Sequence, residues 1–492
     1  MVNAARARLT VPLALVACLA VGLGLMAGRA DLPEAAGAIV GLGVVLAVLI
    51  EPAVGLGLTL LAAPLRAWLN TAYPAMPLDP GQLLFGLTLA AWLARGVARR
   101  QIEVPRLPWP LFAGLAALLA VGAASLWNAP SLPDGLAELA KWVEISVMAA
   151  LVYDAARRGR IGWVLGAALA SGTLQAVLGI WQYGFSATGP ETFAIMGSRF
   201  RAYGTFQQPN PFAGYLGLVW PVAAGLAAHR VAWLRQRKPP ALDWLLFAGL
   251  AGISLLGLVL SFSRGAWLGA ALAGLALAAF WPRRPWAGLA LGTFALLAVL
   301  AAAQAGLLPA ALVGRLDGLS EFTTAYDVRG VPINDENYAV IQRLAFWQSA
   351  RAMADAQPWL GVGLGNFASA YPAYALLNWP LAIGHAHNTY LNTLAETGVL
   401  GLAAYLGLWA GVGGLTFSAL RRRSGWQRGL ALGLLGVWVH LAGHQIVDYL
   451  FVNNTHLLVG AYFGMLAAVS GKAADDMQRA GARVGEFAAW KA

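Results

Sequence analysis

The chain is poor in charged residues and almost free of cysteine. Of its 492 residues, 11% are charged and 59% are hydrophobic, whereas a soluble domain carries roughly 25% charged residues. This balance excludes an ordinary water-soluble protein and predicts a chain solvated mainly by lipid. Cys18 is the only cysteine, so no internal disulfide can form. Internal repeats and low-complexity tracts are also missing, which argues against a solenoid and against a paired-repeat transporter.

What the sequence has in abundance is apolar runs of about 20 residues, the length that crosses a bilayer as a helix. The fold class we predict is an all-α, polytopic membrane protein of about 12–14 transmembrane helices, with an uncleaved first span. The clear runs are Leu9–Gly28, Pro108–Trp127, Ile161–Tyr183, Pro211–His229, Leu242–Leu260, Arg264–Trp281, Trp286–Gln304, Tyr390–Phe417, Leu430–Val447 and Thr455–Val469. Weaker or shorter runs are Ala36–Ile50, Ala53–Leu69, Gln82–Ala94 and Leu136–Asp154.

The formal net charge of +11 comes from short basic clusters between the apolar runs, not from one basic surface, so nucleic acid is not an expected partner. The positive-inside rule places these clusters in the cytoplasm. Threading the runs with that constraint puts both termini inside. The clusters are 6–8, 95–106, 157–160, 230–238, 283–284, 421–428 and the C-terminal tail.

The longest outer loop, residues 306–388, separates two groups of spans. Loops of that length are usually functional or disordered. Here the segment Asn337–Ala356 has apolar residues near helical spacing and is followed by Pro358, which predicts a helix lying on the outer surface. We expect three regions: N-terminal spans at 1–183, a core with this partly helical loop at 184–470, and a cytoplasmic tail at 471–492.

Two arginine-bearing segments lie on the predicted outer side. Arg199 and Arg201 open a polar segment that ends at Asn210, and guanidinium groups bind phosphate bidentately. The alternative is that these arginines reach toward lipid headgroups. Arg264 follows Ser263 in a tight turn between two spans, where an ionisable residue at the membrane surface suggests an anion site. Ser263 is expected to cap the helix that follows.

Histidines gather where the long loop returns to the membrane. His385 and His387 precede Asn388, and an imidazole near neutrality suits a general base. We do not expect a metal, because the outer loops lack cysteine and paired carboxylates at ligand spacing; helix capping and interfacial hydrogen bonds remain the alternative. No Asp-x-Asp motif is present in these loops, so any diphosphate would be held by arginines.

A last polar stripe climbs one helical face toward the outer surface, at His440, His444 and Asp448. We interpret it as interhelical packing or support for the His387 loop, with Asp448 and His444 as candidate acceptor-site or supporting residues. The glycines at 361, 363 and 365 do not follow a strand of a βαβ unit, so a turn is favoured over a dinucleotide fingerprint.

Taken together, these segments resemble the O-antigen ligase and polymerase superfamily of bacterial membrane enzymes. The resemblance rests on His387-Asn388 followed by Gly398-Val399-Leu400-Gly401, on the segment from Arg201 to Asn210, and on Ser263-Arg264-Gly265. It covers roughly residues 190–450. It implies a fold of the multi-spanning glycosyltransferase-C kind and an inner-membrane enzyme with a periplasmic active site.

The resemblance also implies a reaction. A glycan would pass from undecaprenyl diphosphate to a hydroxyl of the lipid A-core oligosaccharide, with inversion and without a metal or other cofactor. Arg201 and Arg264 would bind the diphosphate, and His387 would be the base. An O-antigen polymerase, a protein O-oligosaccharyltransferase and, from another class, a transporter of polyisoprenoid-linked glycans remain alternatives. The transporter is disfavoured because only His440, His444 and Lys141 are expected deeper in the membrane.

Overall fold

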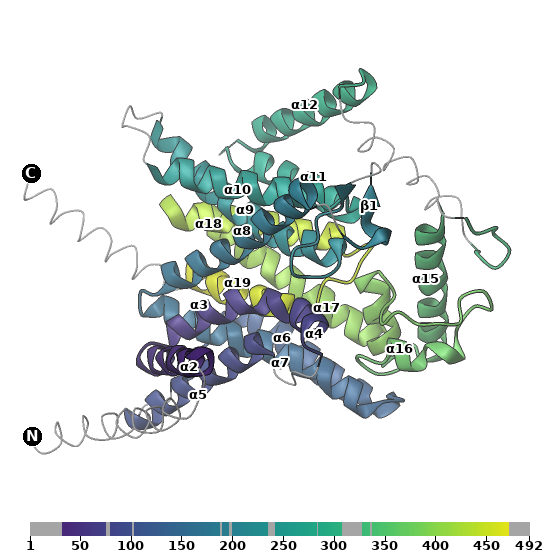
Figure 1. The fold of residues 1–492 in the computed structure, drawn as a ribbon, viewed down its shortest axis with the longest axis horizontal. Coiled ribbons are helices and arrows are strands. Elements are labelled where there is room, and N and C mark those ends of the chain that lie inside the picture. Colours follow the sequence, from purple (N-terminus) through teal and green to yellow (C-terminus); the bar gives the residue numbers. More distant parts are fainter. Residues whose placement is uncertain are drawn as a thin grey trace, which may run out of the picture.

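The computed structural model describes residues 32–74, 79–100, 103–186, 189–195, 199–234, 242–282, 284–307, 327–334 and 337–471. These residues form an all-α bundle, as predicted (Figure 1). Among them, seven helices are long and apolar enough to cross a membrane by length and composition. The first expected span, at residues 9–28, lies outside the described residues.

Each expected span from Ala36 onward coincides with a helix of the bundle. In chain order these are α2 (Leu32–Ile50), α3 (Pro52–Ala62) continued by α4 (Arg66–Ala72), α5 (Pro80–Ala98), α6 (Trp109–Ser125), α7 (Leu132–Arg157), α8 (Ile161–Phe185), α9 (Pro209–Leu234), α10 (Leu242–Leu260), α11 (Arg264–Phe280), α12 (Pro285–Gln304), α17 (Thr389–Arg422), α18 (Gly425–His444) and α19 (Thr455–Ser470). Short 3-10 turns at Ala63–Leu65 and Leu126–Asn128 lie within two of these segments.

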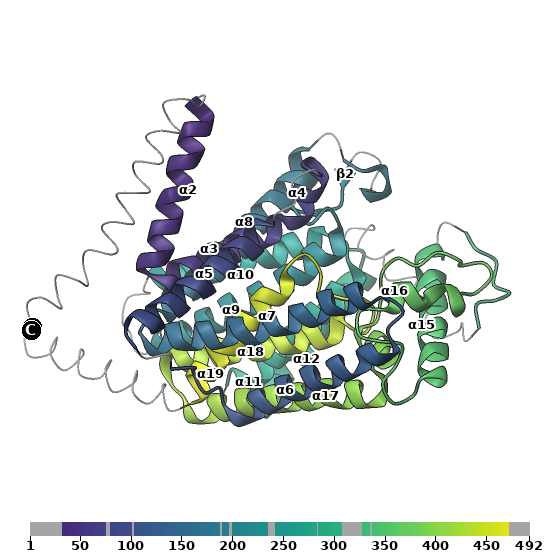
Figure 2. The same cartoon turned by 90° about the horizontal axis from the view of Figure 1, so that it is seen from below.

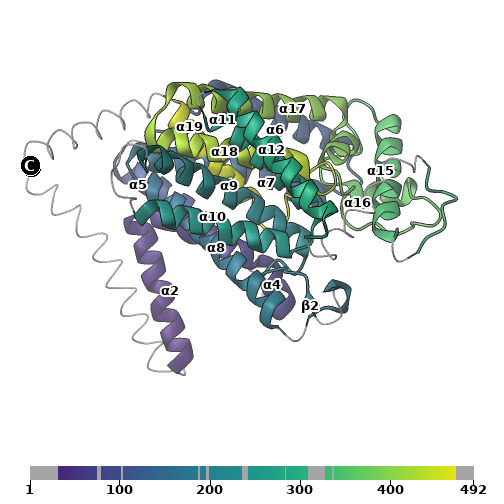
Figure 3. The same cartoon turned by 90° about the horizontal axis from the view of Figure 1, so that it is seen from above.

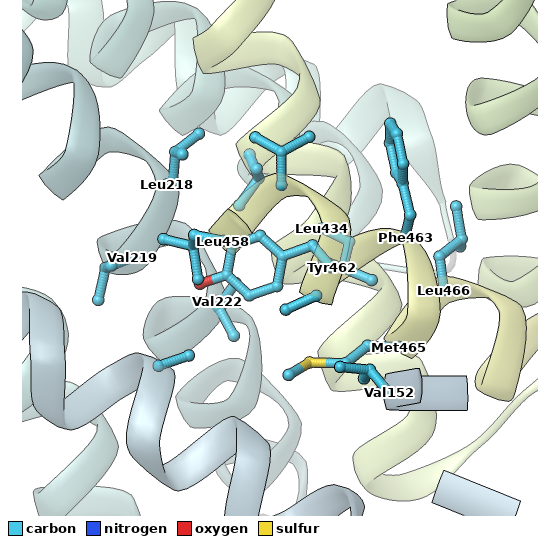
Figure 4. Close-up of a cluster of buried hydrophobic side chains, with 14 of the residues drawn as sticks. Val152, Leu218, Val219, Val222, Leu434, Leu458, Tyr462, Phe463, Met465 and Leu466 are labelled. Atoms are coloured by element: carbon cyan, nitrogen blue, oxygen red, sulfur yellow. The ribbon is translucent and has the colours of Figure 1, made fainter. Parts of the chain in front are cut away.

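The centre of the bundle is α19, which is buried along its whole length. It packs against α7, and a close-up of the core shows Leu458 and Tyr462 of α19 near Val219 and Val222 of α9 (Figure 4). Apolar residues all round a helix indicate a position inside a helical bundle. By contrast, α2 projects away from the bundle (Figure 2), and all of its described side chains except Val48 are exposed or half-buried.

Helix ends that carry the basic clusters meet at one end of the bundle. Glu51, before α3, pairs with Arg95 of α5 at 3.9 Å and with Arg160, before α8, at 3.2 Å. Nearby, Arg158 pairs with Asp154 at the end of α7 at 2.8 Å. The sequence assigned all of these ends to one side, so the alternating order of the spans agrees with the packing.

The opposite end carries the polar loops. The long loop contributes α15 (Tyr338–Ala356), with α16 (Phe367–Ala370) and a 3-10 turn at Tyr371–Ala373 beside it, and these elements lie together beyond the bundle (Figures 1 and 3). The predicted helix Asn337–Ala356 is therefore present. A small antiparallel pair, β1 (Ala194–Ile195) with β2 (Arg199–Phe200), follows a 3-10 turn at Glu191–Phe193 and was not expected from the sequence.

Glycines with left-handed backbones shape this end. Gly361, Gly363 and Gly365 have φ values of 65°, 106° and 72°, which confirms the turn interpretation because residues with a Cβ rarely adopt them. Gly398 has φ 65° and kinks α17. A Cβ there would lie 2.3 Å from the carbonyl carbon of Trp359, so the first glycine of the 398–401 motif serves a close backbone contact.

Candidate active site

His387 and Asp448 meet at the polar end of the bundle. His387 lies just before α17 and Asp448 lies between α18 and α19, and His387 Nδ1 is 3.1 Å from Asp448 Oδ1. The side chain of Asp448 is 7% exposed and that of His387 is 16% exposed. The sequence favoured interhelical packing or support of the His387 loop for the stripe that ends at Asp448, and the structure pairs Asp448 with His387 directly.

The backbone around the pair is held from both helices. Thr389 at the start of α17 donates its N–H to the carbonyl of Gln445 at 3.0 Å and its hydroxyl to the carbonyl of Asp448 at 3.2 Å. The Asn392 side chain accepts from the Ala386 N–H at 3.0 Å. His387 itself has φ 51°, a conformation that costs free energy for a residue with a Cβ and persists where surroundings enforce it.

The electrostatics fix the state of Asp448. Burial alone would raise the pKa of Asp448, but the hydrogen bond from His387, together with the nearby positive charge of Arg343, holds that pKa well below its usual range. An ionised carboxylate can only accept hydrogen bonds. Nδ1 of His387 therefore carries the proton of the shared hydrogen bond, and Nε2 is left with a lone pair for chemistry.

His385 has a different role from His387. Its ring lies 4.5 Å from that of His387, edge to face, and 5.2 Å from that of Tyr449, stacked. Its Nδ1 accepts from the His387 N–H at 3.2 Å. Burial, and then the nearby His387, lower the pKa of His385 to about 3, so this imidazole stays neutral near pH 7 and supports the loop.

Arg201 is bound to the turn that precedes α11. Its Nε donates to the carbonyl of Ser261 at 2.7 Å, and its Nη2 donates to the carbonyl of Phe262 at 3.4 Å and to Asn210 Oδ1 at 3.3 Å. Ser263 caps α11 by accepting from the Ala266 N–H, as predicted. The two predicted arginine segments are therefore in direct contact.

The start of α11 then lies against the end of α18. A Cβ placed on Gly265 would be 2.6 Å from Val447 Cγ2 and 2.7 Å from His444 Cδ2, so only glycine allows this approach. Arg264, which precedes Gly265, is consequently brought next to the segment that carries Asp448. A chain of contacts thus links Arg201, through the 261–265 turn, to the histidine–carboxylate pair.

Three other predicted residues occupy supporting positions. Arg199 is exposed and lies 5.1 Å over the ring of Tyr183, so its guanidinium contacts an aromatic ring at this end of the bundle. Asn388 caps α17 by accepting from the Leu391 N–H at 3.0 Å. His444 is completely buried, and its ring nitrogens have no hydrogen-bond partner among the described residues.

Sequence reasoning missed two contributors to the site. Tyr449 stacks on His385 and donates its hydroxyl to Glu138 of α7 at 2.7 Å. Arg343, inside the predicted outer helix α15, donates to the carbonyl of Val447 at 3.2 Å. The helix was predicted from the spacing of its apolar residues, and that spacing does not indicate a role for Arg343.

His385, His387 and Asp448 form the one group among the described residues whose ligand atoms are close enough to hold a metal ion, all within 4.8 Å of one another. Two histidines and a carboxylate match the donors that zinc uses. However, Arg343 and Lys141 are near enough for their charges to act on His385. Positive charges repel a divalent cation, so these two side chains act against a metal at His385.

One segment of the chain is similar to a known protein family. The family model described as O-antigen ligase matches residues 249–406, a segment that includes Arg264, Arg343 and His387. No curated protein matches the chain. A chain in the solved structure of a peptidoglycan synthase complex is 19% identical with a TM-score of 0.40, covering 74% of this chain and 97% of that chain. Residues 249–406 are thus similar to the O-antigen ligase family, and the multi-helix fold agrees with that similarity.

Proposed function

We propose that this protein transfers a glycan from undecaprenyl diphosphate to a hydroxyl of lipid A-core oligosaccharide. The observation that carries the proposal is the hydrogen bond between His387 and the buried, ionised Asp448, placed beside a turn that gathers Arg201 and Arg264. A base and a cation-rich surface are what transfer from a diphosphate requires.

His387 is the proposed base. Asp448 holds the imidazole with Nδ1–H toward the carboxylate and stabilises the imidazolium that forms. Nε2 removes the proton of the acceptor hydroxyl as its oxygen attacks the anomeric carbon of the donor sugar. The bond from that carbon to the diphosphate oxygen breaks, and its electron pair leaves with the diphosphate. One such displacement inverts the anomeric configuration.

Arg201 and Arg264 are the proposed diphosphate ligands. Negative charge grows on the leaving oxygen during the reaction, and guanidinium groups already in position stabilise it without reorganisation. Arg201 is fixed by two carbonyls and one amide oxygen, which supports such preorganisation. In this mechanism the arginines supply the charge, so no metal or other cofactor takes part.

The location follows from the same interpretation. We place the protein in the inner membrane of a bacterial cell, with both termini in the cytoplasm and the His387 end facing the periplasm. The lipid-linked donor would then enter from the outer leaflet of surrounding membrane lipid. Residues 184–470 would form the catalytic core.

Purified protein offered undecaprenyl-diphosphate glycan with lipid A-core, with a second lipid-linked glycan, or with a peptide tests the acceptor. We expect extension of lipid A-core only, with chelator present and absent. Extension of the second lipid-linked glycan alone would instead identify a polymerase, and modification of the peptide a protein glycosyltransferase. Loss of transfer on adding chelator would overturn the metal-free mechanism.

Substitution of His387 by Ala tests whether the protein is a transferase or a transporter. General bases contribute about 10²–10⁴-fold to rates, so we expect a loss of that order with donor binding retained. A His387→Ala protein that still transferred glycan at the original rate would rule out the assigned base. His456→Ala is the matched control, because His456 is a buried histidine that contacts a separate carboxylate, Glu144, and its loss should not remove the base.

A further inference from the structure

The helix α15 of the outer loop presents two side chains to the base. Phe346 is fully buried and its ring lies 6.2 Å from the ring of His387, nearly parallel to it. Arg343 precedes Phe346 by three positions, and residues three apart share one face of a helix. The face of α15 that covers His387 therefore also carries Arg343.

Contacts on Val447 place Arg343 opposite the start of α11. The Arg343 Nε donates to the carbonyl of Val447 at 3.2 Å, while the side chain of Val447 lies against Gly265. Gly265 at the start of α11 and Arg343 of α15 thus contact the same residue. Asp448 is the next residue, and the charge of Arg343 acts on it.

The guanidinium of Arg343 is only partly used by protein groups. Nη1 donates to the carbonyl of Ala339 at 2.7 Å, and Nε is taken by Val447. Nη2 has no hydrogen-bond partner among the residues that the structure describes. Arg343 is half-buried, so its guanidinium lies at the surface of the α15 contact and can still reach a ligand.

The charge of Arg343 acts on both groups that contact the base. It acts on Asp448 and on His385, so the guanidinium lies close to the histidine–carboxylate pair. Oxygens of a diphosphate bound there would accept from its remaining N–H groups, because guanidinium and phosphate form charge-assisted hydrogen bonds.

We propose that Arg343 is a third arginine of the donor-binding site, supplied by the loop helix α15 and contacting the diphosphate beside the histidine–carboxylate pair. This inference rests on the proposed function. It makes α15 part of the binding site, so that the donor diphosphate and the base are both contacted by one face of one helix.

The test measures inhibition of transfer by inorganic pyrophosphate in wild type, Arg343→Ala, Arg343→Gln and Arg343→Lys. Arg351→Ala is the matched control, because Arg351 lies on the same helix and is exposed. A hydrogen bond to a charged group corresponds to about 10–100-fold in affinity. We expect the inhibition constant to rise by that factor in Arg343→Ala and Arg343→Gln, to recover partly in Arg343→Lys, and to stay unchanged in Arg351→Ala.

A purely structural role would give another pattern. Gln can donate to the Val447 carbonyl as Arg does, so Arg343→Gln would then be the mildest change, and kcat would fall without a change in pyrophosphate inhibition. That result would overturn the inference. Arg264→Ala distinguishes failure of the Arg343 proposal from failure of the proposed function. If Arg264→Ala weakens pyrophosphate inhibition and Arg343→Ala does not, only the proposal on Arg343 is wrong. If neither variant weakens it, the proposed diphosphate site itself is wrong. Thermal unfolding of each variant in detergent checks that the fold is retained.

Discussion

Replacing Asp448 by Asn tests how the base is activated. The substitution keeps the shape of the side chain and an oxygen that can accept from His387, but it removes the negative charge held 3.1 Å from Nδ1. A hydrogen bond to a charged partner is worth about 1.5–3 kcal/mol, and about 1.4 kcal/mol corresponds to a factor of ten. We therefore expect kcat/KM to fall about 10–150-fold on this basis.

The decisive measurement is a double-mutant cycle with His387→Ala, using initial rates of transfer to lipid A-core. If Asp448 acts through His387, Asp448→Asn should cost little once the imidazole is gone, because residues acting as a unit are not additive. Equal losses in both backgrounds would refute the pairing as the source of activation. Asp448 also accepts from the Tyr449 N–H at 2.9 Å, so thermal unfolding should be compared between the single variants.

Three further predictions follow from the packing and the charges. His385→Gln should leave the acid limb of the pH–rate profile in place even if the rate falls. The pKa of His385 is lowered to about 3, so this imidazole gains a proton only far below the pH at which the enzyme works. A displaced acid limb would show that His385 titrates with activity. Gly398→Ala should lower the free energy of unfolding by about 1–3 kcal/mol, because the φ of Gly398 is 65° and an added Cβ would meet the Trp359 backbone. Gly407→Ala on the same helix is the control, since nothing lies within 4 Å of its Cβ position. Equal melting temperatures of the two variants in detergent would contradict the prediction. Gly265→Ala should reduce glycan transfer, because the added Cβ would push the turn that carries Arg264 away from Val447 and His444. Gly274→Ala on the same helix should keep the wild-type rate, since nothing lies within 4 Å of its Cβ position. Equal activities of the two variants would argue against the close approach of α11 to the 444–447 segment.

The sequence by itself determined the membrane fold and provided the candidate site residues. Low charge and repeated apolar runs leave few options, because a backbone in lipid must satisfy its hydrogen bonds within helices. The outer helix at 338–356 was also predictable from its spacing and the following proline. The sequence also singled out His387 and Arg264 as candidates, because ionisable groups at a membrane surface are few.

Tertiary structure alone decided which of these residues meet. No spacing along the chain shows that His387 reaches Asp448, which lies 61 positions away, or that the Arg201 segment binds the turn before α11. Arg343 was missed because its surroundings in sequence are those of an ordinary amphipathic helix, and only the packing of α15 on the 447–448 segment turns it toward the base. Contacts between distant segments depend on how helices pack, and helix packing is set by side-chain shape on both surfaces, which a single sequence pattern does not encode.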